Sequence, residues 1–241
     1  MSSYDSIRGA NLAKRIGIYR NSYKDIDEQF VDLIYHYLRS EYRVLNAGPG
    51  LTSLHLKGKC REVVGVDMEQ SIFENEDIDT PLIGDLERLN LSKNSFDMIV
   101  CRCVVEHLRN PRACFEGFSR VLKDGGLVFI LTPNLFHYGT LIAKLAPLWF
   151  HVWYVKRRGW SAENQFPTYY RANRRQKLSD MMTGAGFKTV EVRMAECYPG
   201  LLDFSCFTLL FGLVYLKIVN YFQYLQDLRS NIVAVFQKCR G

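Results

Sequence analysis

The amino-acid sequence predicts an α/β domain in which helices cover both faces of a parallel sheet. Short apolar runs alternate with helical stretches from residue 43 to residue 132. Pro111 suits the first turn of a helix, and Gly125 and Gly126 suit its end. No linker rich in Gly, Pro or Ser divides the 241 residues, of which 48% are hydrophobic, so the chain can bury one substantial core.

Each element is predicted from its own pattern. Ile26, Phe30, Leu33 and Ile34 recur at helical spacing, which predicts an amphipathic helix over residues 26–38. The apolar runs predict strands over residues 43–46, 63–67, 81–84, 96–101 and 127–132, with a helix over 111–122. Further along, we expect a helix over 174–183, a strand over 187–194, a mostly apolar helical stretch over 199–228 and a final strand over 231–237.

Composition narrows the class of protein. The first ten residues lack the basic and apolar pattern of a secretory signal, so we expect a cytoplasmic protein. Seven cysteines without any Cys-x-x-Cys pair indicate reduced thiols and no zinc site.

Residues 151–180 hold seven Lys or Arg against two Asp or Glu, a local charge of +5 within a net charge of +6. Such a cluster suits nucleic acid, an anionic membrane or an acidic acceptor, and equally a solvated basic face.

A glycine turn follows the first strand directly. Gly48 and Gly50 would let the backbone approach a ligand closely, and we expect the next helix to offer free N–H groups at its start. Asp67 ends the second strand, 19 residues after Gly48, where a carboxylate can accept both ribose hydroxyls of an adenosine group. The dinucleotide fingerprint would need glycine at position 53, which is Ser53, and this counts against NAD.

The third and fourth strands add two more patterns. Gly84-Asp85-Leu86 ends strand three, where a carboxylate can reach an adenine amino group. Strand four is followed by Val105-Glu106-His107-Leu108 and then by Lys123-Asp124-Gly125-Gly126. This ordered series, over residues 40–135, resembles the class I S-adenosyl-L-methionine (SAM) dependent methyltransferase superfamily, in the broad branch that includes the ubiquinone and menaquinone biosynthesis methyltransferases.

The resemblance implies a fold, a cofactor and a site. It implies a Rossmann-like, seven-stranded, mostly parallel sheet whose last strand is antiparallel. It also implies a single SAM-dependent methyltransferase domain over 1–241, with a helical cap (1–40), a cofactor-binding half (41–135) and an acceptor-side half with apolar helical insertions (136–241). The cofactor SAM would contact residues of the turn and of the ends of strands one to four. They are Asn46, Gly48, Gly50, Asp67, Met68, Asp85, Leu86, Cys101 and Cys103.

Three departures from the family pattern stand out. Asn46 occupies a position that is often acidic, and Pro49 and Thr52 replace the small residues usual in the turn. Some quinone-related O-methyltransferases use a Glu-x-x-Glu-His metal cluster, whereas this chain has Cys103-x-x-Glu106-His107. With one oxygen ligand lost, we expect no metal.

His107 is the candidate catalytic base. Transfer from an activated sulfonium needs mainly in-line positioning in a dry pocket, but a hydroxyl acceptor also needs a base, and His suits neutral pH. The alternative is that His107 only orders its loop or caps the helix that begins at Pro111. His137, Tyr169 and Tyr170 are weaker candidates, because aromatic residues there more often form pocket wall.

The second half is unusually apolar. Residues 204–216 form an uncharged run of 13, shorter than the roughly 20 that a spanning helix needs. Residues 141–160 place Trp149, Trp153 and Trp160 beside the basic run 156–158. This mixture suits peripheral membrane contact through 141–160 and 199–224, or a closed pocket for an apolar substrate.

The sequence therefore predicts O-methylation of a small apolar, isoprenoid, lipid or lipid-linked glycan acceptor. An RNA or other nucleic-acid methyltransferase is the alternative that the basic cluster suggests, but no Asp/Asn/Ser-Pro-Pro-aromatic tetrad of the amino-adenine enzymes follows strand four. A non-catalytic SAM-binding module is a third reading, prompted by the departures at Asn46 and Cys103.

Overall fold

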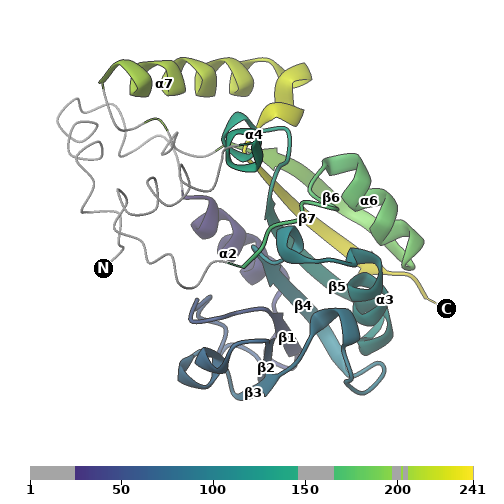
Figure 1. Ribbon diagram of the computed structural model, residues 1–241. Coiled ribbons are helices and arrows are strands. Elements are labelled where there is room, and N and C mark those ends of the chain that lie inside the picture. Colours follow the sequence, from purple (N-terminus) through teal and green to yellow (C-terminus); the bar gives the residue numbers. More distant parts are fainter. Residues whose placement is uncertain (1–24, 146–165, 197–201, 203–205, 241) are drawn as a thin grey trace. The chain divides into compact units, whose positions relative to one another are not determined.

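A computed structural model describes residues 25–145, 166–196, 202 and 206–240 of the chain (Figure 1). Its centre is a seven-stranded sheet with the order β3-β2-β1-β4-β5-β7-β6. The strands are β1 (Arg43–Ala47), β2 (Glu62–Asp67), β3 (Thr80–Ile83), β4 (Phe96–Arg102), β5 (Leu122–Pro133), β6 (Phe187–Ala195) and β7 (Asn231–Lys238). The α-helices are α2 (Ile26–Tyr37), α3 (Pro111–Val121), α4 (Tyr138–Leu145), α6 (Arg175–Gly184) and α7 (Cys206–Tyr221).

The sheet is mostly parallel. The pairs β1–β2, β1–β4, β2–β3 and β4–β5 are parallel. β7 is antiparallel to β6. The N–H of Cys239, just after the end of β7, donates to the carbonyl of Gly186, just before the start of β6, so opposite ends of the two strands lie together. The predicted fold class, with an antiparallel last strand, is confirmed.

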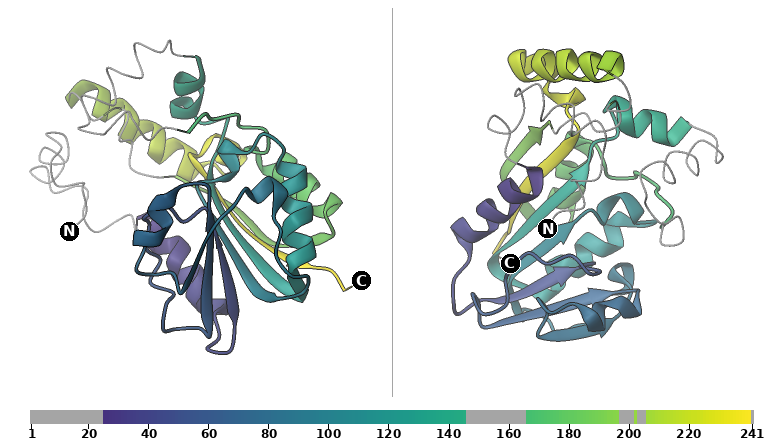
Figure 2. Two further views of the ribbon diagram at one scale, coloured as in Figure 1. Left: turned by 60° about the horizontal axis from the view of Figure 1, so that its bottom comes forward. Right: turned by 90° about the vertical axis from the view of Figure 1, so that its left-hand side faces the viewer.

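Helices pack on both faces of the sheet. Tyr37 of α2 contacts Phe129 of β5, with ring centroids 5.7 Å apart. α3 and α6 pack beside each other on the opposite face (Figures 1 and 2). Because both faces are covered, the central strands read as continuous apolar runs, and residues 98–101 of β4 are fully buried.

Two expectations about connections are wrong. Residues 48–61, between β1 and β2, form turns, so no helix follows the glycine turn. Gly125 and Gly126 do not end α3, which ends at Val121; they lie inside β5, where the pairing skips from Leu122 to Leu127 against β4. Gly125 has φ +78°, and a Cβ on Gly126 would lie 2.9 Å from the Asp97 carbonyl oxygen, so this bulge needs both glycines.

The chain divides into two compact units that interleave along the sequence. The first comprises Met1–Gln29, Asn134–Phe166 and Met194–Asn231. The second comprises Phe30–Pro133, Pro167–Arg193 and Ile232–Gly241 and holds most of the sheet. The division into regions at residues 40 and 135 stays a prediction.

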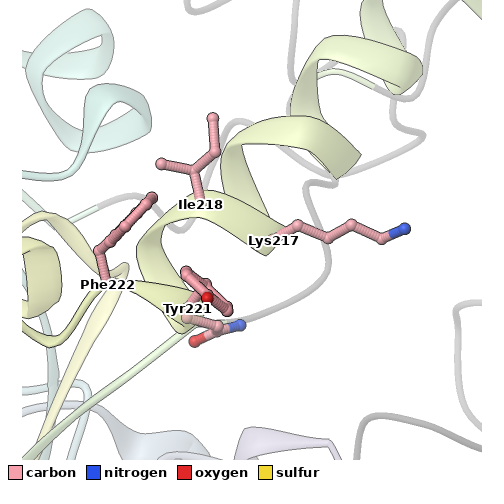
Figure 3. Close-up of a pocket in the computed structure, with 5 residues that line it drawn as sticks. Lys217, Ile218, Tyr221 and Phe222 are labelled. Atoms are coloured by element: carbon pink, nitrogen blue, oxygen red, sulfur yellow. The ribbon is translucent and has the colours of Figure 1, made fainter.

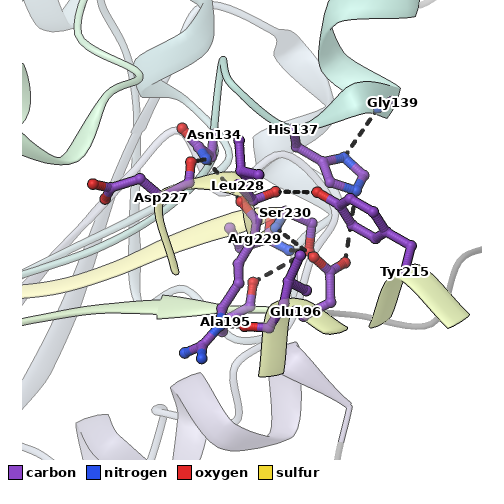
Figure 4. A network of polar contacts seen from close by, with 12 residues as sticks. Asn134, His137, Gly139, Ala195, Glu196, Tyr215, Asp227, Leu228, Arg229 and Ser230 are labelled. Atoms are coloured by element: carbon purple, nitrogen blue, oxygen red, sulfur yellow. Dashed lines mark hydrogen bonds and ion pairs between the residues drawn. The ribbon is translucent and has the colours of Figure 1, made fainter. Parts of the chain in front are cut away.

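A buried polar junction ties the segments of the first unit together (Figure 4). The side-chain amide of Asn134 donates to the carbonyls of Asp227 and Arg229, at 2.7 and 2.8 Å. His137 Nε2 lies 3.6 Å from Glu196 Oε1, too far for a hydrogen bond, and burial lowers the pKa of His137 to about 4. The Tyr215 hydroxyl of α7 donates to the Leu228 carbonyl at 2.6 Å. The junction therefore fixes which face of α7 is buried.

α7 is apolar all round. Leu209, Leu216 and Val219 are buried on one face. The opposite face exposes six large apolar side chains. These are Phe207, Leu210, Phe211, Val214, Ile218 and Tyr221, here called the α7 stripe. None of the described helices is both long enough and apolar enough to cross a membrane.

Candidate functional site

The candidate site lies at the carboxyl ends of β1, β2 and β4, within the second unit. Ala47 is opposite Val66 in β2 and opposite Cys101 in β4, so the segments that leave these three strands meet at one edge. In parallel α/β sheets this edge is where ligands bind.

The glycine turn packs closely against the loop that follows β4. Gly48 has φ +69°, and a Cβ there would lie 2.4 Å from Cγ2 of Val104. Its N–H donates to the Val66 carbonyl at 2.8 Å. Any other residue at position 48 would be strained and would displace Val104, so glycine is required for both reasons.

Two backbone N–H groups, one in the glycine turn and one just after β2, hold the Asp67 carboxylate. Its Oδ2 accepts the Gly50 N–H at 2.8 Å, and its Oδ1 accepts the Glu69 N–H at 3.0 Å. The structure thus brings Gly48, Gly50 and Asp67 together, as the sequence predicts, and it does so without the helix that we expected. Asn75, which sequence analysis missed, donates to the carbonyls of Gly50 and Thr52 and fixes the far side of the turn.

Asp85 lies two residues after the end of the neighbouring strand β3. Its Oδ1 accepts the Glu87 N–H at 2.8 Å, so the first turn of η3 (Leu86–Arg88) orients its carboxylate. Leu86 is buried, whereas Met68 is 67% exposed, so Met68 has the freer side chain of the two. As contacts of a cofactor, all of these residues stay predictions.

Three further predicted contacts lie on β1, on β4 and just after β4. Asn46 is 2% exposed, and its Nδ2 has no hydrogen-bond partner among the described residues. Cys101 is fully buried, and burial raises the pKa of its thiol, so it stays protonated. Cys103 follows β4 with φ +53°, a conformation that non-glycine residues rarely adopt.

A buried polar network supports the loop after β4. The Thr132 hydroxyl donates to Glu106 Oε2 at 3.0 Å, and the side-chain amide of Asn173 donates to Thr132 Oγ1 at 2.7 Å and to the Pro133 carbonyl at 3.0 Å. Glu106 is 5% exposed, and burial raises the pKa of its carboxyl group. Sequence analysis gave no role to Thr132 or Asn173.

His107 lies in η4 (Val105–His107), next to this network. Its Nδ1 is 3.1 Å from the Pro167 carbonyl oxygen. A carbonyl only accepts, so Nδ1 carries the proton, and in a neutral ring Nε2 is the basic nitrogen. The His107 N–H donates to the carbonyl of Val104, the residue that packs against Gly48. The candidate base and the glycine turn therefore belong to one packed assembly.

Comparison with known proteins agrees with this arrangement. Residues 45–130 match the methyltransferase domain family. An uncharacterized methyltransferase of Bacillus subtilis, YcgJ, is 31% identical over 99 residues, which cover 36% of this chain and 39% of that protein. A ubiquinone biosynthesis O-methyltransferase of Idiomarina loihiensis is 29% identical over 99 residues, which cover 37% and 41%. The chain thus spans about two fifths of the length of these relatives.

Solved structures share the fold over more of the chain. The crystal structure of YcgJ superposes with a TM-score of 0.55 at 15% identity, covering 89% of this chain and all of that one. Phosphoethanolamine N-methyltransferase 2 of Haemonchus contortus, in complex with SAM, gives 0.54 at 17% identity, covering 88% and 53%. The strand order and the antiparallel last strand agree with the methyltransferase domain family that residues 45–130 match.

Proposed function

We propose that this protein transfers the methyl group of SAM to an oxygen atom of a small apolar, isoprenoid, lipid or lipid-linked glycan acceptor. The observation that carries the proposal is the packed edge at which the Gly48 turn, the Asp67 carboxylate and the His107 loop meet. The proposed nucleoside site and the candidate base would both belong to this edge.

The residues of this edge fit SAM. Glycine at position 48 gives the turn no side chain and lets its backbone pack directly against Val104. The buried, unpartnered Nδ2 of Asn46 belongs to an amide that can meet a polar group of the cofactor's methionine part. Asp67 and Asp85 keep lone pairs for ribose hydroxyls and for an adenine amino group, since each carboxylate oxygen accepts more than one hydrogen bond.

The protein's own contribution to the reaction is to position and deprotonate the acceptor. When bound, SAM supplies an activated methyl group on a sulfonium. His107 Nε2 takes the proton of the acceptor hydroxyl, while the oxygen forms its bond to the methyl carbon and the carbon–sulfur bond breaks. The Pro167 carbonyl holds the ring in the required tautomer.

The direct test is binding and turnover of SAM. SAM at one hundred times its Kd is expected to stabilise the fold by about 2.7 kcal/mol, measured by thermal unfolding. Isotope-labelled SAM, incubated with fractionated lipids, glycans and RNA, should label a lipid or lipid-linked fraction. Stabilisation by NAD and not by SAM would overturn the proposal, and labelling of RNA alone would replace the acceptor class.

We also propose that the protein works in the cytoplasm as a peripheral membrane protein, with the α7 stripe resting on the bilayer. The six exposed apolar side chains lie on one helix face, and α7 carries no Asp or Glu. Lys217, the sole charged residue of α7, borders the stripe and lines an open, mostly apolar pocket of about 490 Å³ with Ile218, Tyr221 and Phe222 (Figure 3). An apolar face flanked by aromatic and basic side chains suits a helix that lies in the membrane interface. The basic run 156–158 and the tryptophans of segment 141–160 lie outside the described residues.

The double variant Phe207→Ser with Phe211→Ser tests membrane docking. Flotation with liposomes that contain phosphatidylglycerol should fall at least about tenfold, because burying one such side chain contributes about 1.5–3 kcal/mol. Binding of SAM should not change. Val190→Ser, which alters an exposed apolar residue of β6, is the matched control and should float like the unaltered protein. Equal flotation of the double variant would exclude the stripe as the contact.

A further inference from the structure

The chain returns from the first unit along a segment that is fixed beside His107. The N–H groups of Tyr169 and Tyr170 both donate to the Glu106 carbonyl, at 2.7 and 3.1 Å. Tyr170 has φ +51°, a strained conformation for a residue with a side chain. Tertiary contacts therefore hold residues 167–173 in one place against the loop after β4.

Arg109 of the loop after β4 and Arg171 of this segment meet at the ring of Tyr169. The guanidinium carbons of Arg109 and Arg171 lie 5.6 and 5.7 Å from the centroid of the same ring, that of Tyr169. Arg109 Nε donates to the Tyr169 hydroxyl oxygen at 2.8 Å, and Arg171 Nη1 donates to the Arg109 backbone carbonyl at 2.6 Å. Both side chains are thus ordered, although both residues are exposed.

No carboxylate neutralises this pair among the residues that the structure describes. The ion pairs of the described chain involve other arginines and lysines. Glu87, on the neighbouring η3, instead accepts the Asn110 N–H at 2.8 Å. The Tyr169 hydroxyl accepts from Arg109 and donates to no described group, so its own proton remains available.

We infer that Arg109, Arg171 and Tyr169 form a binding site for a phosphate or diphosphate group of the acceptor. Two guanidinium groups and a hydroxyl donor match an anion that carries more than one charge and several acceptor oxygens. Arg109 follows His107 by two residues, and Pro167, two residues before Tyr169, accepts from the His107 ring at 3.1 Å, so an acceptor anchored at this site would hold its hydroxyl close to the candidate base. The inference rests on the proposed methyl transfer and adds to it that the acceptor is a phosphorylated molecule.

Calorimetric titration of the full-length protein, saturated with S-adenosylhomocysteine, with inorganic diphosphate tests the site. Arg109→Gln and Arg171→Gln should each raise the Kd for diphosphate by about tenfold or more, through loss of a charge-assisted contact. Arg61→Gln makes the same change of charge just before β2, at the amino ends of the parallel strands and away from this site. It should leave the Kd for diphosphate within about twofold. Citrate, titrated in parallel, should bind more weakly than diphosphate.

Arg109→Gln alone is decisive if Arg171→Gln fails to fold, because the Arg171 side chain bonds the backbone of residue 109 and not its side chain. No heat from diphosphate, an equal loss in Arg61→Gln, or tighter binding of citrate would overturn the inference. Binding of labelled SAM is measured on separate aliquots of the same proteins, without S-adenosylhomocysteine. Loss of SAM binding with diphosphate binding intact would count against the proposed function and not against this site.

Discussion

Replacing His107 with alanine is expected to lower kcat by about 10²–10⁴-fold, the usual effect of losing a general base, while the affinity for SAM stays near that of the unaltered protein. The ring is oriented by the Pro167 carbonyl, and its loop contacts the Gly48 turn through Val104. The rate is measured as transfer of labelled methyl to the responsive acceptor fraction, and SAM binding is measured by calorimetry.

His36→Ala is the matched control, because His36 is an exposed residue of α2 that belongs to neither site. It should change neither kcat nor affinity. A loss of turnover below about tenfold for His107→Ala would leave His107 with a structural role in its loop. An equal loss of SAM binding would make it a wall of the cofactor pocket instead.

Replacing Asp67 with alanine is expected to weaken SAM binding by about 1.5–3 kcal/mol, the typical contribution of hydrogen bonds to a charged group. The variant loses the proposed ribose contacts and also releases the Gly50 N–H, which Asp67 Oδ2 holds at 2.8 Å. Calorimetry with SAM gives the change in Kd directly.

Two companion variants separate these effects. Asp67→Asn keeps an oxygen for Gly50 and should recover part of the affinity. Asp85→Ala should weaken SAM binding less than Asp67→Ala does, because Asp85 is expected to make one hydrogen bond to adenine. Unchanged affinity in Asp67→Ala would show that the second strand does not deliver the ribose ligand.

The sheet could be predicted from sequence because buried parallel strands are nearly continuous apolar runs, and β1, β2 and β4 each read that way. The expectation of a helix after Gly50 was wrong. A glycine turn that can approach a ligand does not need a helix behind it, and here the Asp67 carboxylate accepts the Gly50 N–H. The misplaced end of α3 has a similar origin. A Gly-Gly pair serves a helix end and a strand bulge equally well, and only the pairing with β4 decides between them.

The candidate site was predictable where its residues follow strands and not where they arrive from a distant segment. Gly48 and Asp67 could be located by their place after β1 and β2. Asn173, by contrast, sits in a basic stretch with no periodic pattern, and its bonds to Thr132 and Pro133 span some forty residues. Contacts of that separation leave no local signal in a single sequence.

The bond from Asn173 to the Pro133 carbonyl also has a consequence for how such a protein can diversify. It joins Pro133, at the end of β5, to Asn173, just before α6, so the two ends of the excursion over residues 134–172 are held together. Closing a longer excursion costs little more, about 0.6 kcal/mol for each doubling of length. Excursions of different length and composition can therefore be exchanged at this hydrogen bond, which makes positions 133 and 173 the natural junctions for chimeras that keep the proposed SAM-binding residues and vary the proposed acceptor side.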